Sequence, residues 1–197
     1  MSKSDPSAAK KQRIKTIKWV VTIFLVTIFV SGVISLASDL IMEASSMIVA
    51  FVILLVIVLL GIVFDIVGVA VTSADESPFH SMAARKVPGA QESIRLLRNA
   101  ERVSSICNDV VGDICGVVSG SASATIAAQV IAATEFSWPQ AISLVMSALV
   151  AGLTVGGKAI GKTFAINSCT KIVHGVGKLS WAFRNFPRFF KDRNKNS

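Results

Sequence analysis

Four long, predominantly apolar runs divide this chain, at residues 19–37, 47–72, 103–133 and 141–157. Runs of about 17 to 25 apolar residues are typical of helices that cross a membrane. Within lipid, only helices and closed barrels satisfy all backbone hydrogen bonds. Charged residues make up 16% of the chain, whereas a soluble domain usually carries about 25%. We therefore predict an all-α integral membrane protein with four transmembrane helices.

The first run has a second interpretation, as a secretory signal peptide with Ala37 before the cleavage point. Its apolar region is longer than the roughly 7–15 residues of such a signal. We therefore expect residues 19–37 to be an uncleaved transmembrane helix.

Lysine and arginine gather in three segments between and beside the apolar runs. The first 18 residues hold six of them, residues 73–102 hold five, and residues 158–197 hold nine, whereas the links at 38–46 and 134–140 hold none. Positive charge marks the cytoplasmic side of a membrane protein. Four spans that start inside place all three basic segments in the cytoplasm, so we predict a multi-pass cell-membrane protein with cytoplasmic N- and C-termini.

The same pattern sets the expected organisation and partners. We expect a flexible basic arm (1–18), an extra N-terminal transmembrane helix (19–37), a main transmembrane domain with juxtamembrane helices (47–183) and a basic tail (184–197). Basic segments beside spans favour the anionic headgroups of the lipid bilayer as partner. No nucleic-acid motif is present, so we expect no nucleic-acid binding.

Amphipathic spacing predicts two helices that lie on the cytoplasmic membrane surface. In the middle segment, apolar residues recur at helical spacing beside Arg95 and Arg98. In residues 166–183, before the basic tail, a similar stripe is interrupted by Gly175 and Gly177, which we expect to weaken the helix. The two stripes are Ile94, Leu97 and Ala100, then Ile166, Cys169, Ile172, Val173, Val176 and Phe183.

Three acids fall inside the predicted spans: Asp65, Asp109 and Asp113. An aspartate at the centre of a span costs about 2.5–3.5 kcal/mol on insertion scales, so we expect the three to gather inward. One interpretation is a hydrated cation site between the second, third and fourth spans. A second is a closed polar network in which Lys158 neutralises an acid, and a third is that Asp65 lies hydrated near the inner interface.

Helical spacing assigns these acids to two polar faces. Asp109 and Asp113 share one face of the third span, and Asp65 lies on a stripe of the second span. The third span also carries a ladder of small residues at every fourth position, for which we favour packing inside the monomer over a dimer contact. The further members of the two faces are Ser105, Ser121 and Thr125, then Gly68 and Thr72; the ladder is Gly112, Gly116, Gly120, Ala124, Ala128 and Ala132.

Nothing in the sequence predicts an enzyme. The three cysteines form no CxxC motif, and His80 and His174 each lie in a basic segment without a second histidine or a cysteine that would complete a metal-binding motif. No nucleophile and base pair is visible.

Several short motifs resemble the transmembrane domain of the CNNM/CorB/CorC magnesium transporters. The stretch from Phe64 to Ser73 is similar to the motif that ends the family's first span, and Asn99-Ala100-Glu101-Arg102 is similar to its Asn-Pro-Glu-Arg sequence. Asn108 is the nearest match to an asparagine of the next family span. The run from Gly157 to Lys162, with Ala165-Ile166-Asn167, is similar to the motif that ends the last span.

This resemblance implies three core spans, a cytoplasmic helical belt and a homodimer, without the paired CBS domains that typically follow. The ion-site motif is degenerate, because Asp65 replaces a serine, Gly68 a glutamate, Lys158 a second glutamate and Gly161 a proline. We expect a divalent cation transporter, with Mg²⁺ as the transported ion, or a non-transporting regulatory or interaction protein on a transporter scaffold. The expected ion ligands are Asp65, Ser73, Asn108, Asp109 and Asp113, with backbone from Gly157.

Overall fold

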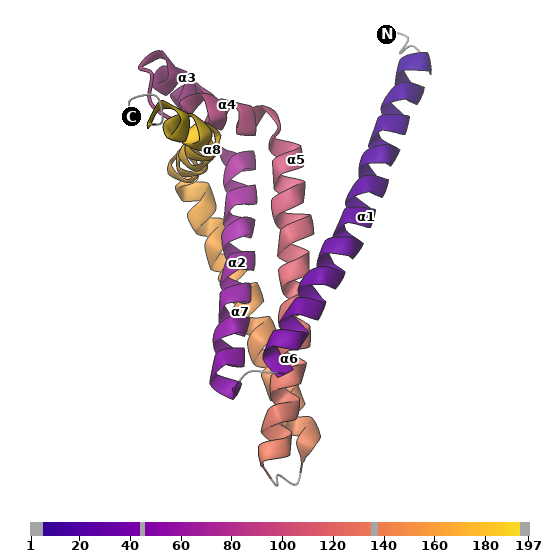
Figure 1. Ribbon diagram of the computed structural model, residues 1–197. Helices are drawn as coiled ribbons and strands as arrows, with labels where there is room; N and C mark the ends of the chain where they lie inside the picture. The colour runs from indigo at the N-terminus through magenta and orange to yellow at the C-terminus, as the bar shows by residue number, and fades with distance from the viewer. Residues whose placement is uncertain (1–5, 44–45, 135–137, 194–197) are drawn as a thin grey trace.

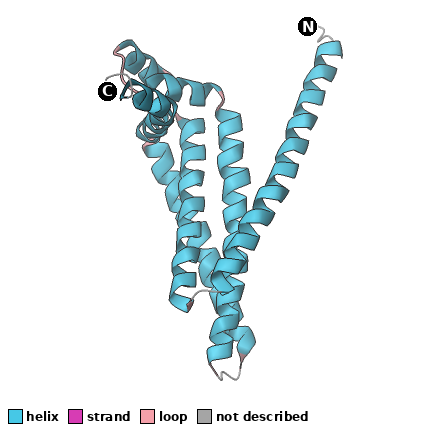
Figure 2. Ribbon diagram, in the orientation of Figure 1, coloured by secondary structure: helices cyan, strands magenta, loops and turns pink. Residues whose placement is uncertain are grey.

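The computed structural model describes residues 6–43, 46–134 and 138–193, and within these ranges the chain is helical apart from short turns (Figures 1 and 2). The elements are α1 (Pro6–Glu43), α2 (Met47–Ser73), α3 (Ser77–Ala84), α4 (Ala90–Arg98), α5 (Ala100–Ser104), the π-helix η1 (Ser105–Gly112), α6 (Asp113–Ala133), α7 (Pro139–Asn167) and α8 (Cys169–Arg193). The predicted all-α class is confirmed.

Four helical segments of the described chain are long and apolar enough to cross a membrane, as the sequence predicts. They are Ile14–Ser38, Met47–Ser73, Ala100–Ala133 and Pro139–Asn167. The second is rich in valine and isoleucine, which favour strands in water. Inside lipid an isolated segment satisfies its backbone groups only as a helix, and this overrides the side-chain preference.

Two boundaries differ between the prediction and the structure, because the helices continue past the predicted ends. The basic arm is helical from Pro6 and runs without a break into the first span, since its alanine, lysine and arginine residues favour helix. The fourth span continues ten residues beyond Gly157, to Asn167. Lys158 therefore lies within the spanning helix and not in the basic segment after it. Residues 1–5 and 194–197 of the arm and tail lie outside the described residues, as do residues 135–137 of the link after α6.

The centre of the bundle is α2, which packs against α6, α7 and η1 (Figure 1). The two short helices α3 and α4 cross one end of this bundle together with α8, and we call these three helices and their joining turns the belt. The start of α1 lies at the same end as the belt but stands away from the bundle. Helix α1 contacts mainly α6, and near the belt a cation–π contact places the Arg102 guanidinium 5.2 Å from the Trp19 ring.

Two apolar clusters hold the bundle together, one on each side of a polar layer. The first joins α2 to α6 at the end away from the belt, and the second joins α2 and α7 to the belt. Their buried members are Ala50, Leu54, Val58, Ala122 and Ile126 in the first, and Ala70, Val71, Phe79, Leu97, Ala165 and Val173 in the second.

Close backbone contact fixes α8 to the turn before α4. A Cβ atom at Gly177 would collide with Ser93 Oγ and would lie 2.6 Å from the Gly89 carbonyl oxygen. The hydroxyl of Ser93 donates to the Val173 carbonyl oxygen at 3.2 Å. The predicted tail helix is present, and α8 is continuous through both Gly175 and Gly177. Gly177 is the residue that permits this contact.

A pair of alanine substitutions tests this junction. Gly177→Ala should lower the free energy of unfolding in detergent by about 1–3 kcal/mol, because the added methyl group overpacks a rigid contact. Gly175→Ala is the matched control: nothing lies within 4 Å of its Cβ position, so it should be neutral or raise stability by up to about 1 kcal/mol through helix propensity. Equal thermal unfolding curves for the two variants would contradict the close contact.

Candidate functional site

A polar layer lies in the bundle between the two apolar clusters, and Asp65 of α2 is its buried acid. The residue is 5% exposed, and its Oδ2 atom has no hydrogen-bond partner. A buried acceptor without a donor costs about 1–3 kcal/mol, and more when it is charged. The great majority of buried polar atoms in proteins have a partner, so this carboxylate is the most unusual group among the described residues.

Asn108 of η1 supplies a second unsatisfied oxygen. Its Oδ1 atom is buried without a partner, while its Nδ2 donates to Ser104 Oγ at 3.2 Å. A Cβ atom at Gly68 would overlap this amide, so the absence of a side chain there admits Asn108 against α2. Gly68 follows Asp65 by three residues on the buried face of α2, a separation of about 5–6 Å between Cβ positions. The two orphan oxygens therefore lie in one region of the bundle interior.

The π-helix explains why Asn108 reaches this position. Its residues, Ser105–Gly112, bond to the fifth residue along rather than the fourth. This wider turn rotates the side chains away from the positions that a 3.6-residue period predicts. Cys107 and Gly112 become buried, while Asn108 is partly buried. Single π-helical turns inside helices are frequent at functional sites.

Helix α7 closes the same layer with Gly157 and Lys158. A Cβ atom at Gly157 would collide with the side chain of Ile62 of α2, so the glycine makes room for that side chain. The Lys158 Nζ atom lies 3.4 Å from the Cβ position of Gly112 and within electrostatic range of Cys115. Three segments that the sequence motifs single out, around Asp65, Asn108 and Gly157, thus meet at the middle of the bundle.

The expected gathering of all three intramembrane acids is wrong. Asp109 and Asp113 are exposed on the outer surface of η1 and α6, whereas Asp65 is buried. Ser73 is also exposed, at the end of α2. Within the described ranges no group of three or more His, Cys, Asp or Glu side chains is arranged to hold a metal ion. The structure therefore brings together Asp65, Asn108 and the region of Gly157, and leaves the other expected ligands outside.

The polar face of α6 also differs from the expected one. Its buried hydroxyls belong to Ser119 and Ser123, which donate to the carbonyl oxygens of Gly116 and Gly120, each at 3.0 Å. Most of the small-residue ladder is exposed, so packing inside the monomer is not its role in the described chain. The exposed members are Gly120, Ala124, Ala128 and Ala132.

Among the described residues, Lys158 also makes no direct contact that would neutralise an aspartate, as one interpretation of the sequence expects. All ion pairs shorter than 4.0 Å that the described residues form lie in the belt, and they involve Glu76 and Glu92. Lys158 forms none with an aspartate. The Asp65 Oδ2 atom therefore has neither an ion pair nor a hydrogen-bond donor among the described residues.

Comparison with protein-family models, with curated proteins and with solved structures gives no significant match to this chain.

The contact between Gly68 and Asn108 can be tested by a double-mutant cycle. Gly68→Ala should lower the free energy of unfolding by about 1–3 kcal/mol, because the methyl group displaces the Asn108 amide from a packed interior. Gly68→Ala combined with Asn108→Ala should recover most of this loss, because the obstruction is removed. The control is Gly116→Ala, whose Cβ position has nothing within 4 Å. Purely additive effects on the unfolding temperature would contradict the contact.

Proposed function

We propose that this protein is a membrane cation transporter whose ion site is centred on Asp65 and Asn108. The observation that carries the proposal is the pair of buried oxygens, Asp65 Oδ2 and Asn108 Oδ1, that have no hydrogen-bond donor. Ionisable residues inside membrane spans are expensive and commonly mark ion pathways or proton relays. A purely structural aspartate at this depth would be expected to have a donor from a neighbouring helix.

The ligand chemistry favours a hard cation. Carboxylate and amide oxygens suit Mg²⁺, which commonly binds through one or two carboxylates and keeps several of its own waters. One carboxylate at the centre of the bundle is consistent with such a partly hydrated ion. The nearby ammonium of Lys158 repels cations, so the ion is expected to bind weakly and to leave readily.

The resemblance to the magnesium transporters supports the same site. The position that corresponds to the family's motif glutamate, Gly68, packs against the position that corresponds to its asparagine, Asn108. The segment of the third motif, Gly157–Lys158, borders the same layer. The three motif segments are thus neighbours in space, which is the arrangement that an ion site requires. Asp109, Asp113 and Ser73 are not part of the proposed site.

Ion binding can be measured on the full chain in a neutral detergent. Millimolar MgCl₂ should raise the unfolding temperature, while choline chloride at equal ionic strength should not. Asp65→Asn should weaken the apparent Mg²⁺ affinity at least tenfold, a change of about 1.4 kcal/mol. Asp109→Asn, which removes one charge from the exposed surface of η1, is the matched control and should retain binding. If both variants bind Mg²⁺ as tightly as the parent, or if the parent does not bind it, the proposed site is rejected. Stabilisation by NaCl alone would reassign the site to a monovalent ion.

A non-transporting interaction protein is the second candidate, and Lys158 is the observation that favours it. Its ammonium borders the same polar layer, so a modest side-chain movement would close the site with an internal ion pair. In that case Asp65→Ala alone should destabilise the fold strongly, and Asp65→Ala with Lys158→Met should restore much of the loss. Under the transporter proposal, by contrast, Lys158→Met alone should leave stability nearly unchanged and should increase Mg²⁺ flux into liposomes.

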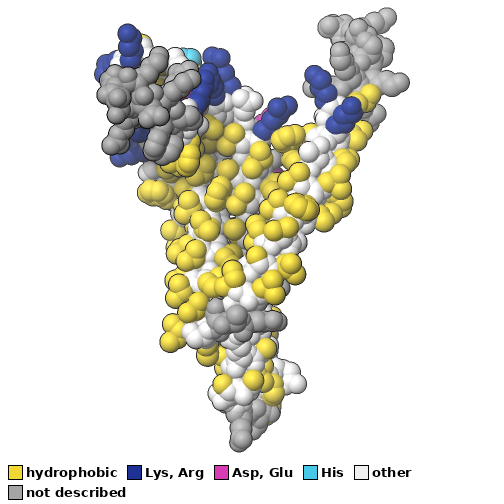
Figure 3. Space-filling model, in the orientation of Figure 1, with side chains coloured by type: hydrophobic (Ala, Val, Ile, Leu, Met, Phe, Trp, Pro, Cys, Tyr) yellow, Lys and Arg dark blue, Asp and Glu magenta, His cyan; other side chains and the backbone are white. Residues whose placement is uncertain are grey.

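Orientation follows from charge. In Figure 3 the dark blue Lys and Arg side chains gather at the end of the molecule that carries the belt, while the rest of the visible face is mainly apolar. We assign this end to the cytoplasm by the positive-inside rule.

A further inference from the structure

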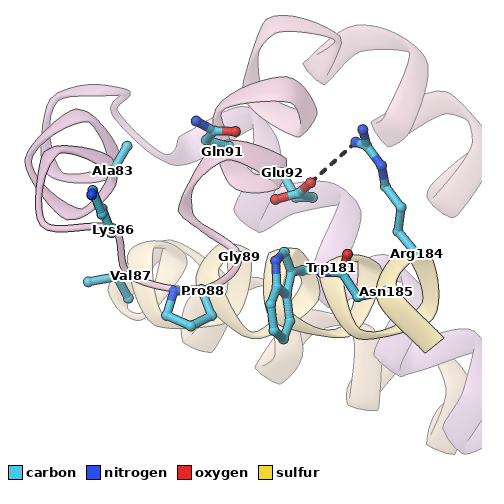
Figure 4. A pocket seen from close by; sticks show the side chains of 10 residues that line it. All are labelled: Ala83, Lys86, Val87, Pro88, Gly89, Gln91, Glu92, Trp181, Arg184 and Asn185. Atoms are coloured by element: carbon cyan, nitrogen blue, oxygen red, sulfur yellow. Dashed lines mark hydrogen bonds and ion pairs between the residues drawn. The ribbon is translucent and has the colours of Figure 1, made fainter. Parts of the chain in front are cut away.

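A pocket of about 320 Å³ lies in the belt, between the α3–α4 turn and α8, well away from the Asp65 site (Figure 4). The turn forms one wall and α8 forms the other, so segments about 90 residues apart in the sequence build it. Its lining residues are Ala83, Lys86, Val87, Pro88, Gly89, Gln91, Glu92, Trp181, Arg184 and Asn185.

The walls of this pocket are held rigidly. Gly89 has φ of 86°, and a Cβ atom there would lie 2.6 Å from the Lys178 backbone nitrogen. One turn of helix away, a His174 ring nitrogen lies 3.3 Å from the Pro88 carbonyl oxygen. The pocket is therefore part of the packed junction between α4 and α8.

Lys86 adds a strained conformation at the rim. Its φ of 55° makes it the non-glycine residue with left-handed backbone among those that the structure describes. Such conformations cost of order 1–3 kcal/mol and cluster at ligand-binding sites. The turn therefore holds a lysine, rather than the glycine that would fit at lower cost, beside the pocket.

The charge balance of the pocket favours an anion. Glu92 is its single carboxylate, and Arg184 NH1 and Arg95 NH1 lie 3.4 Å and 3.9 Å from its Oε1. Its side chain is 12% exposed, whereas that of Arg184 is 61% exposed, so the acid is covered and the guanidinium remains accessible. In Figure 4 the Arg184 side chain extends from α8 toward Glu92 of α4, and the Trp181 ring lies in front of α8. The lining therefore holds two cations, Lys86 and Arg184, against one carboxylate that is already paired.

The uncharged lining residues add hydrogen-bond donors. Gln91 and Asn185 each carry an amide NH₂, and the Trp181 indole carries one N–H. A planar guanidinium, an ammonium and amide N–H groups together match the oxygens of a phosphate group. Small-molecule pockets begin at about 300 Å³, so this one has room for a phosphate and a small polar substituent.

Its position indicates where such a ligand comes from. On the face of α8 away from the turn, Leu179 and Phe183 are exposed apolar side chains, as expected for a helix that lies on a membrane. Tryptophan is enriched at headgroup level, and Trp181 lies at the pocket itself. Basic pockets beside spanning helices are typical binding sites for anionic headgroups.

We propose that the belt pocket binds a phosphate-bearing anion, either the headgroup of an anionic phospholipid or a small soluble phosphate ester. This proposal does not depend on the function of the Asp65 site.

Binding can be measured on the purified full chain in a zwitterionic detergent. Short-chain phosphatidylglycerol should raise the unfolding temperature, while phosphatidylcholine of the same chain length should not. Lys86→Gln with Arg184→Gln should weaken the apparent affinity at least tenfold. Lys171→Gln is the control, because Lys171 is an exposed cation of the same helix outside the pocket; it should change the affinity less than twofold.

The source of the phosphate is given by parallel titrations with glycerol 3-phosphate and inorganic phosphate. Stabilisation by phosphatidylglycerol alone indicates a lipid headgroup, and stabilisation by glycerol 3-phosphate indicates a soluble ester. If the double variant is too unstable to purify, Gln91→Ala removes an uncharged donor and should weaken binding several-fold. An equal loss in Lys171→Gln, an unchanged affinity in the pocket variants, or no ligand effect on the parent would overturn the proposal.

Discussion

The bilayer offers no hydrogen bonds, and every polar group that this chain places within it must find a partner in the protein. The backbone meets this demand by forming helices throughout the spans. The hydroxyls of Ser119 and Ser123 meet it by bonding to carbonyl oxygens of their own helix. Asp65 does not meet it, because its carboxylate is buried without a donor. The two apolar clusters on either side of the polar layer hold the bundle closed around that exception. The packing of the two clusters therefore offsets the free-energy cost of burying the Asp65 carboxylate without a donor.

Glycines decide how closely the helices approach this polar layer. At Gly68 the missing side chain admits the Asn108 amide, and at Gly157 it lets α7 approach Ile62 of α2. The belt uses the same device at Gly177, where α8 lies directly on the turn before α4. At the polar layer these glycines make room for side chains of the neighbouring helix, and in the belt they also bring two backbones together. Rigid walls of this kind orient the few polar groups that chemistry requires.

The number of the spans and their approximate positions could be predicted from the sequence, because apolar runs of this length have one solution in lipid. The ends of the first and fourth helices could not, because the helices continue into polar sequence. The inward position of Asp65 followed from the same cost argument. The position of Asp109 and Asp113 was predicted wrongly, because the cost argument places every acid of a span inside, whereas these two are exposed on η1 and α6. The π-helix η1 was not predicted either. Nothing in the sequence of residues 105–112 marks that wider turn. The belt pocket was also beyond prediction, since Lys86 and Arg184 are far apart in the chain and only the packing of α8 on α4 brings them together.

Helix α1 contributes no residue to either apolar cluster, and its apolar window has no buried residue. The remaining helices therefore have a complete interior without it. Its effect lies in the number of helices: with α1 the described chain has four helices that could cross a membrane, so the start of α1 lies at the same end of the molecule as the belt (Figure 1). The other three such helices alone would be an odd number, and the first of them, α2, begins at the end opposite the belt (Figure 1). The first helix thus decides at which end of the molecule the helical part of the described chain starts.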